Sequence, residues 1–220
     1  MRKNIGFFSI SILLLLAFAV SGCAVGFYKG RPSDIATIDE LKDELARLKE
    51  AKSLLESRLK KEIDSDQVTV NMEDRGLVIT FLAEILFDSG KDKVTSEGEG
   101  LLLKVSRVIM DERIENYIGI EGHTDNEPIK HSGWKSNWEL STARATSVLH
   151  FLVDDGGFAP EKLSATGYGE YRPLTTNETP EGRQQNRRVE IIIKPEEIAK
   201  PIRGGGISPG NRTQNEGYIK

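Results

Sequence analysis

The sequence has little cysteine and no excess of positive charge. Cys23 is the single cysteine in 220 residues, which excludes an intramolecular disulfide and a metal site built from several cysteines. Lys and Arg total 30 against 34 Asp and Glu, for a net charge of −4. That balance argues against a general nucleic-acid binder, which displaces counterions with a basic excess. The 38% of apolar and 29% of charged residues suffice for one globular domain with additional segments.

Long apolar runs are absent except near the N-terminus. Residues 5–20 are predominantly apolar, follow Arg2 and Lys3, and precede small residues. This order predicts an export signal over residues 1–22. A helix of residues 5–20 is shorter than the hydrocarbon core of a bilayer, although an extension to Phe27 leaves an uncleaved anchor helix as an alternative.

The end of this signal resembles the bacterial lipobox. Val20-Ser21-Gly22 stands directly before Cys23, and the resemblance implies that Cys23 is acylated and becomes the first residue of the mature protein. Acyl chains would anchor the chain to a membrane, since each buried methylene contributes about 0.8 kcal/mol. Ala24, where a sorting signal for the inner membrane has Asp, implies an outer-membrane lipoprotein that faces the periplasm. The alternative is an ordinary secretory signal in which the cysteine has no role.

A tether and a helical stalk are expected next. Residues 23–33 contain Gly26, Gly30 and Pro32 and predict a short tether. Residues 34–66 predict a coiled coil of two or three chains, and hence a homo-oligomer, because leucine and isoleucine recur at heptad spacing. The alternative is a single amphipathic helix packed on its own domain. The heptad positions are Ile38, Leu41, Leu45, Leu48, Leu55 and Leu59, with Lys52 at the remaining one.

Residues 67–194 alternate between strand and helix patterns. The periodicities predict a hairpin of two strands (68–72 and 77–81), a short apolar segment (85–87), helices over 96–110 and 137–153, strands over 117–121, 163–166 and 189–194, and a loop over 167–182. This order predicts an α+β fold, a mixed sheet with helices packed on one face, preceded by the coiled-coil stalk. Residues 195–220 hold few large apolar side chains and are expected to be disordered.

Charged side chains gather where the predicted strands end. Asp125 follows one strand, and Arg144 lies on the helix that comes after it. If the strand end faces that helix, a carboxylate and a guanidinium converge on one pocket. Such a pair suits a zwitterion, because the carboxylate holds an ammonium and the guanidinium grips a carboxylate with two hydrogen bonds. A structural ion pair is the alternative.

These segments resemble the OmpA C-terminal domain family. The resemblance covers roughly Val68 to Lys194, with all motifs in order. It is carried by Glu121-Gly122-His123-Thr124-Asp125-Asn126, Asn137-Trp138-Glu139-Leu140-Ser141 with Arg144-Ala145, Gly167-Tyr168-Gly169-Glu170, Asn177, Glu181-Gly182-Arg183 and Asn186-Arg187-Arg188-Val189-Glu190-Ile191. The long loop after Asp125 looks most like the MotB variant of the family. Residues 5–20 contain no acidic residue, so the ion-channel role of MotB does not carry over, and the lipid-anchored layout is closer to the peptidoglycan-associated lipoprotein.

The resemblance implies non-covalent binding of peptidoglycan through the diaminopimelate of its stem peptide. By the same resemblance, Asp125 takes the ammonium and Arg144 the carboxylate of that residue. Further positions that would line or support the pocket are Phe87, Asp88, Thr124, Asn137, Leu140, Ala143 and Arg188. The expected role is an outer-membrane lipoprotein that tethers the membrane to the cell wall.

Enzymatic and cofactor sites find little support in the sequence. It has no H-E-x-x-H helix and no nucleophile elbow, and Gly167-x-Gly169 lacks the third glycine of a dinucleotide site. We therefore expect no catalytic residue, metal or cofactor. His123 is expected to be a buried or turn-supporting imidazole, and Trp138 a packing residue at the helix start. We expect two of the three arginines Arg183, Arg187 and Arg188 to cap a loop and brace acidic neighbours, with a phosphate-binding patch as the alternative. A periplasmic peptidoglycan hydrolase that uses His123 or Asp125 as base, and an accessory subunit of an envelope or motor complex, remain alternatives.

Overall fold

The structure is a computed structural model that describes residues 32–130 and 132–195, with side chains from residue 38 on. The predicted signal (1–22), the lipidation site Cys23, nearly all of the tether (23–33) and the tail (195–220) lie outside the described residues, apart from a few residues at their ends. The chain divides into two compact units, Met1–Leu41 and Lys42–Lys220. Within the described residues, no helix combines the length and the apolarity that a membrane span requires.

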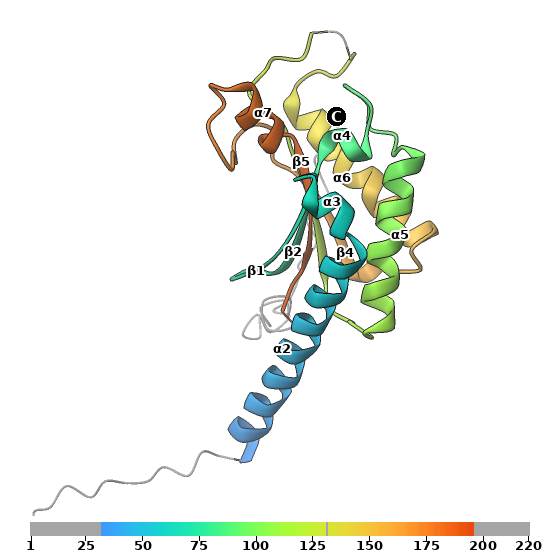
Figure 1. The fold of residues 1–220 in the computed structure, drawn as a ribbon, viewed down its shortest axis with the longest axis vertical. Helices are drawn as coiled ribbons and strands as arrows, with labels where there is room; N and C mark the ends of the chain where they lie inside the picture. Colours follow the sequence, from blue (N-terminus) through green and yellow to red (C-terminus); the bar gives the residue numbers. More distant parts are fainter. Residues whose placement is uncertain (1–31, 131, 196–220) are drawn as a thin grey trace, which may run out of the picture. The chain divides into compact units, whose positions relative to one another are not determined.

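The second unit is built on a sheet of five strands, in the order β1-β2-β5-β3-β4 (Figure 1). The strands are β1 (Val68–Glu73), β2 (Gly76–Leu82), β3 (Ile118–His123), β4 (Leu163–Gly167) and β5 (Arg188–Ile193). β3 and β4 run parallel, and every other neighbouring pair is antiparallel. The sheet is therefore mixed, as the sequence predicts.

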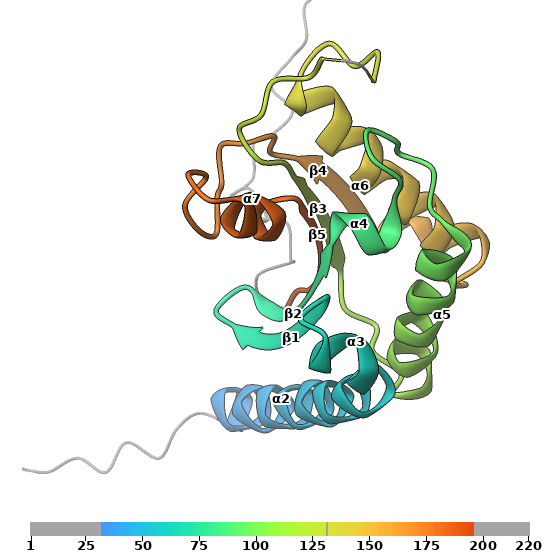
Figure 2. The ribbon, with the colours of Figure 1, turned by 45° about the horizontal axis from the view of Figure 1, so that its top comes forward.

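Helices α5 (Ser96–Asp111) and α6 (Asn137–Asp154) pack on the same side of this sheet (Figure 2). The first is capped by Thr95, whose hydroxyl accepts a hydrogen bond from the Gly98 N–H, and the second by Ser136. α6 connects the parallel strands β3 and β4 and packs against both of them. The α+β class with helices on one face of a mixed sheet is thus confirmed.

Two segments differ from their predicted structure. The apolar segment 85–87 belongs to a one-turn helix, α4 (Ala83–Leu86), followed by a bridge between Phe87 and Val94. The predicted loop 167–182 ends in a further helix, α7 (Pro180–Asn186). Thr179 caps that helix and Pro180 occupies its first turn, which is a local start signal that the pattern of apolar residues does not show.

The leucine and isoleucine positions predicted to form the coiled coil fall into two groups. The long helix α2 (Pro32–Arg58) is followed by α3 (Lys60–Asp64). Leu48, Leu55 and Leu59 are buried in the core of the second unit, so the globular part begins well before residue 67. For these positions the structure matches the alternative of an amphipathic helix packed on its own domain. Ile38 and Leu45 remain about half exposed, and the coiled coil stays a prediction for them.

Candidate functional site

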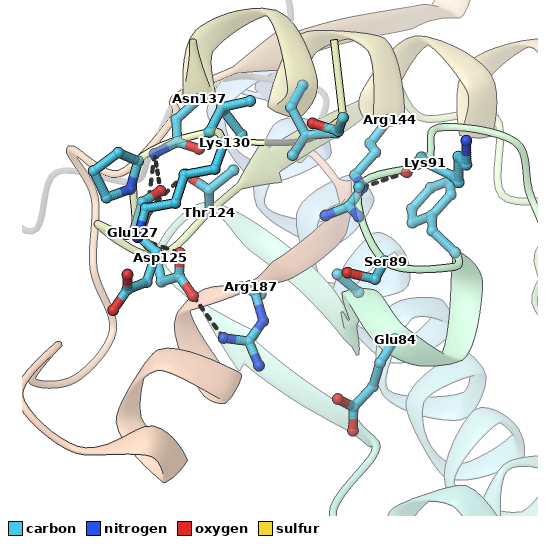
Figure 3. A pocket seen from close by; sticks show the side chains of 17 residues that line it. Glu84, Ser89, Lys91, Thr124, Asp125, Glu127, Lys130, Asn137, Arg144 and Arg187 are labelled. Atoms are coloured by element: carbon cyan, nitrogen blue, oxygen red, sulfur yellow. Dashed lines mark hydrogen bonds and ion pairs between the residues drawn. The ribbon is translucent and has the colours of Figure 1, made fainter. Parts of the chain in front are cut away.

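A cavity of about 540 Å³ opens between the end of β3, the first turns of α6 and the loop after α4 (Figure 3). Six predicted site residues contribute to its wall: Phe87, Thr124, Asp125, Asn137, Leu140 and Arg144. They come from three segments that are distant in the chain. The sheet brings them together because β3 ends beneath the N-terminal half of α6.

Asp125 is a buried carboxylate at the end of β3. Its Oδ1 accepts a hydrogen bond from the Glu127 N–H at 3.1 Å, and its Oδ2 accepts one from Nη1 of Arg187 at 2.5 Å. Figure 3 shows this ion pair at one side of the cavity, with Arg144 entering from α6. The carboxylate is therefore directed at a cation, here a neighbouring side chain.

Arg144 is 5% exposed and makes no ion pair with any residue that the structure describes. Its Nε donates to the carbonyl of Lys91 at 2.9 Å, its Nη2 lies 3.5 Å from the carbonyl of Asp88, and its guanidinium stacks over Phe87 at 5.1 Å. Burial, and then the charge of Arg187, lower the pKa of Arg144 to about 10. A buried guanidinium without a counter-charge is costly, so the cavity wall favours an anion.

Asn137 braces the polar side of the cavity. Its amide donates to the carbonyl of Asp125 at 3.3 Å, to that of Glu127 at 3.1 Å and to Oε2 of Glu170 at 2.7 Å. A further link, from Nε1 of Trp134 to the carbonyl of Gly90 at 2.9 Å, joins the loops on either side. The walls around Asp125 are thus held by hydrogen bonds before any ligand arrives.

Three predicted site residues do not line the cavity. Asp88 contributes only its backbone carbonyl, to Arg144. Ala143 lies one helical position from Arg144 and faces a different hollow, beside Trp138. Arg188 points to the opposite face of the sheet, where its Nε donates to Glu190 at 2.6 Å, because successive strand residues face opposite sides.

Sequence reasoning missed several residues of the cavity. Arg187 was not among the predicted site residues, but it lines the wall and forms an ion pair with Asp125. Adjacent residues of an extended segment face opposite sides. The burial of Arg188 on one side of β5 could therefore have indicated that Arg187 faces the other side. The other missed side chains are mostly charged or polar and include Glu84, Ser89, Lys91, Glu127, Lys130 and Ser132.

A second buried polar cluster lies on the face of the sheet opposite to the core. Ligand-type atoms of Glu121, His123 and Glu190 lie within 4.8 Å of one another. Arg75 donates to both carboxylates, at 3.0 and 2.8 Å, and Arg188 donates to Glu190. Two guanidinium groups thus already balance the two carboxylates, so this cluster does not favour a metal ion.

His123 lies in this second cluster and not in the cavity. It is 2% exposed, stacks on Tyr168 at 5.3 Å between centroids, and has no hydrogen-bond partner on either ring nitrogen. Burial, and then the charge of Arg188, lower its pKa to about 3. Among the residues that the structure describes, no histidine lines the cavity.

Comparison with known proteins agrees with this fold. The OmpA family profile matches residues 86–187. Motility protein B of Bacillus subtilis (strain 168) is 40% identical over 153 residues, which are 70% of this chain and 58% of that protein. The outer-membrane lipoprotein YfiB of Pseudomonas aeruginosa is 29% identical over 140 residues, 61% of this chain and 80% of the lipoprotein.

A solved structure, described as the cell wall anchor of the T6SS from Pseudomonas aeruginosa, superposes with a TM-score of 0.58. It is 33% identical and covers 64% of this chain and 97% of the solved one. The chain thus contains a domain of the OmpA family, over residues 86–187. It spans less than two thirds of the length of the first curated relatives that it matches, between 47% and 64%.

Proposed function

We propose that the domain binds peptidoglycan non-covalently, through the diaminopimelate of the stem peptide. The free end of that residue carries an ammonium and a carboxylate. Arg144 would take the carboxylate and Asp125 the ammonium, with Arg187 released from Asp125 when the ligand enters. The observation that supports this most is the buried Arg144, which faces the cavity without a counter-ion among the described residues.

A test of this site uses purified peptidoglycan and the full chain. Arg144→Ala is expected to weaken co-sedimentation by about 2–5 kcal/mol, the usual effect of removing one partner of a buried charged contact. Arg107→Ala, at an exposed position of α5, is the matched control and should bind as the wild type does. Arg144→Met keeps much of the apolar volume of the side chain and removes its charge, so it should lose binding in the same way and separates the loss of charge from the loss of packing. Unchanged binding by Arg144→Ala would refute the site.

At the level of the whole protein, we propose an outer-membrane lipoprotein that is anchored by acylated Cys23 and tethers the membrane to the cell wall. Relatives named outer-membrane lipoprotein YfiB and probable lipoprotein YiaD support this layout. Together with the lipobox-like residues, they favour a position at the outer membrane, facing the periplasm. A homo-oligomer formed through the exposed Ile38 and Leu45 of α2 belongs to the same proposal.

The accessory-subunit alternative has an observation in its favour. The identity of 40% to motility protein B is higher than that to the lipoproteins, and one superposable structure is described as the cell wall anchor of the T6SS. Both names fit a domain that holds a larger machine to the wall. In this variant of the proposal the cavity has the same ligand, and the partners on the membrane side differ.

The hydrolase alternative is the weaker one. His123 lies outside the cavity, and the carboxylate of Asp125 already forms an ion pair with Arg187. We therefore propose a binding domain and not an enzyme. In the co-sedimentation test, release of soluble muropeptides that disappears in Asp125→Ala would support the hydrolase instead.

A further inference from the structure

Two aromatic rings stand exposed next to the cavity. Trp138, expected to pack at the start of α6, is 46% exposed, and Tyr171 is 64% exposed. The two rings stack on each other, with 5.0 Å between centroids and 22° between planes. Large aromatic side chains in this position contribute little to the core, so their exposure indicates a contact surface.

The backbone that carries Tyr171 is held rigidly against α6. The N–H of Gly169 donates to the Ser141 hydroxyl at 2.9 Å, and its carbonyl accepts from the N–H of Thr124 at 2.9 Å. Farther along, the buried Asn186 accepts from the N–H groups of Leu174 and Thr175. The exposed rings are therefore preorganised, and a ligand would not have to order them.

A shallow hollow of about 370 Å³ lies beside the Trp138 ring. Its wall is formed by Trp138, Glu139, Thr142 and Ala143. It combines an aromatic face with a carboxylate, a hydroxyl and a small side chain. A pyranose ring offers the complementary groups, since its C–H face packs on an aromatic ring and its hydroxyls donate to carboxylates.

This surface adjoins the cavity in the chain, although the two share no wall residue. Asn137 lines the cavity and directly precedes Trp138, and Glu170, which accepts a hydrogen bond from Asn137, directly precedes Tyr171. Trp138 lies about 9 Å from Arg144 along the axis of α6. Two extended residues, the number that separates diaminopimelate from the sugar in a stem peptide, span about 7 Å.

From this geometry we propose that Trp138, Tyr171 and the adjacent hollow bind a sugar ring of the glycan strand to which the stem peptide is attached. The inference rests on the proposed function of the cavity. A sugar fits better than a protein partner, because the exposed apolar surface is small and mixed with Glu139 and Thr142, whereas stable protein interfaces bury about 800 Å² on each side.

The test compares three probes by isothermal titration calorimetry on the full chain. They are the free tripeptide that ends in diaminopimelate, the same tripeptide on N-acetylglucosaminyl-N-acetylmuramic acid, and the disaccharide alone. Trp138→Ala is expected to lower the affinity for the disaccharide-tripeptide about tenfold, the order of one aromatic contact, and to leave that for the free tripeptide unchanged. Tyr171→Ala should act in the same direction, and Trp138→Phe should retain part of the difference.

The matched control is Tyr117→Ala, which removes an exposed aromatic ring at the opposite end of β3 and should change neither affinity. Two results would overturn the sugar site: equal affinity of the wild type for both peptide probes, or an equal loss of affinity for both probes in Trp138→Ala. Either result would favour a protein partner as the ligand of this surface. If neither peptide probe binds, the proposed function fails. The disaccharide alone then decides the sugar site: a shift of the Trp138 indole resonance supports it, and no shift overturns it.

Discussion

Neighbouring side chains at the ends of the strands have opposite surroundings. Arg187 reaches into the cavity and holds Asp125, whereas Arg188 is buried on the other face of the sheet and holds Glu190. The same alternation separates His123, which is buried outside the cavity, from its neighbour Thr124, which lines the cavity wall. A shift of one position therefore decides whether a charged residue meets the ligand or stabilises the fold.

The buried His123 predicts a pH dependence of stability. Its pKa in the folded protein is lowered to about 3 by burial, and then by Arg188, from an ordinary value near 6.5. Between these values the unfolded chain binds a proton that the folded chain does not, so the free energy of unfolding falls as the pH falls below about 6.5. His123→Phe, which can keep the stacking on Tyr168, should reduce this loss by about 2–3 kcal/mol at a pH of about 4.5.

Urea unfolding at a series of pH values measures this difference. His150→Gln, at an exposed position of α6, is the control and should follow the wild type. An identical pH slope in His123→Phe and wild type would show that the proton uptake on unfolding comes from other groups.

At the scale of the elements, glycines set how closely α6 approaches the sheet. A Cβ at Gly122 of β3 would lie 2.1 Å from the carbonyl of Ser141, and one at Gly167 of β4 would lie 2.1 Å from the Thr142 hydroxyl. Only strands without side chains at these two points allow the helix to sit so near. This approach brings Asn137 and Arg144 over the end of β3, where Asp125 lies.

A pair of alanine substitutions tests this packing. Gly122→Ala should lower the free energy of unfolding by about 1–3 kcal/mol, because the helix must move away from β3. Gly100→Ala, in α5 with open space around the new methyl group, should raise it by about 0.5–1 kcal/mol. Chemical unfolding of both variants measures the two effects. A stable Gly122→Ala variant with unchanged peptidoglycan binding would contradict the role given to the close approach.

The whole molecule would join two attachments, a lipid at Cys23 and the cavity around Arg144. If so, one substitution should abolish each attachment without affecting the other. Cys23→Ser is expected to leave the membrane fraction while it still co-sediments with peptidoglycan, and Arg144→Ala to do the reverse. Fractionation of cells with and without digestion of the cell wall measures both properties. Retention of Cys23→Ser in membranes would indicate an uncleaved anchor helix in place of the lipid.

Much of the fold was predictable because its signals are local. Alternation over 68–72 and 77–81 specified the hairpin, and apolar spacing specified α5 and α6 to within a residue or two. The helix α7 carries a local signal too, in Thr179 and Pro180, but has too few apolar residues for a periodicity. The family resemblance added six of the cavity residues, including Asp125 and Arg144.

The sequence by itself determined the strands, the long helices and the residue types of the site, since each depends on neighbours within a few positions. Only the tertiary structure decided which surface covers Leu48, Leu55 and Leu59, because a leucine seam fits its own domain as well as another chain. It alone also placed Arg187 against Asp125 and left Arg144 without a counter-ion among the described residues. Such pairings depend on segments that meet only when the sheet is assembled, and no local pattern records them.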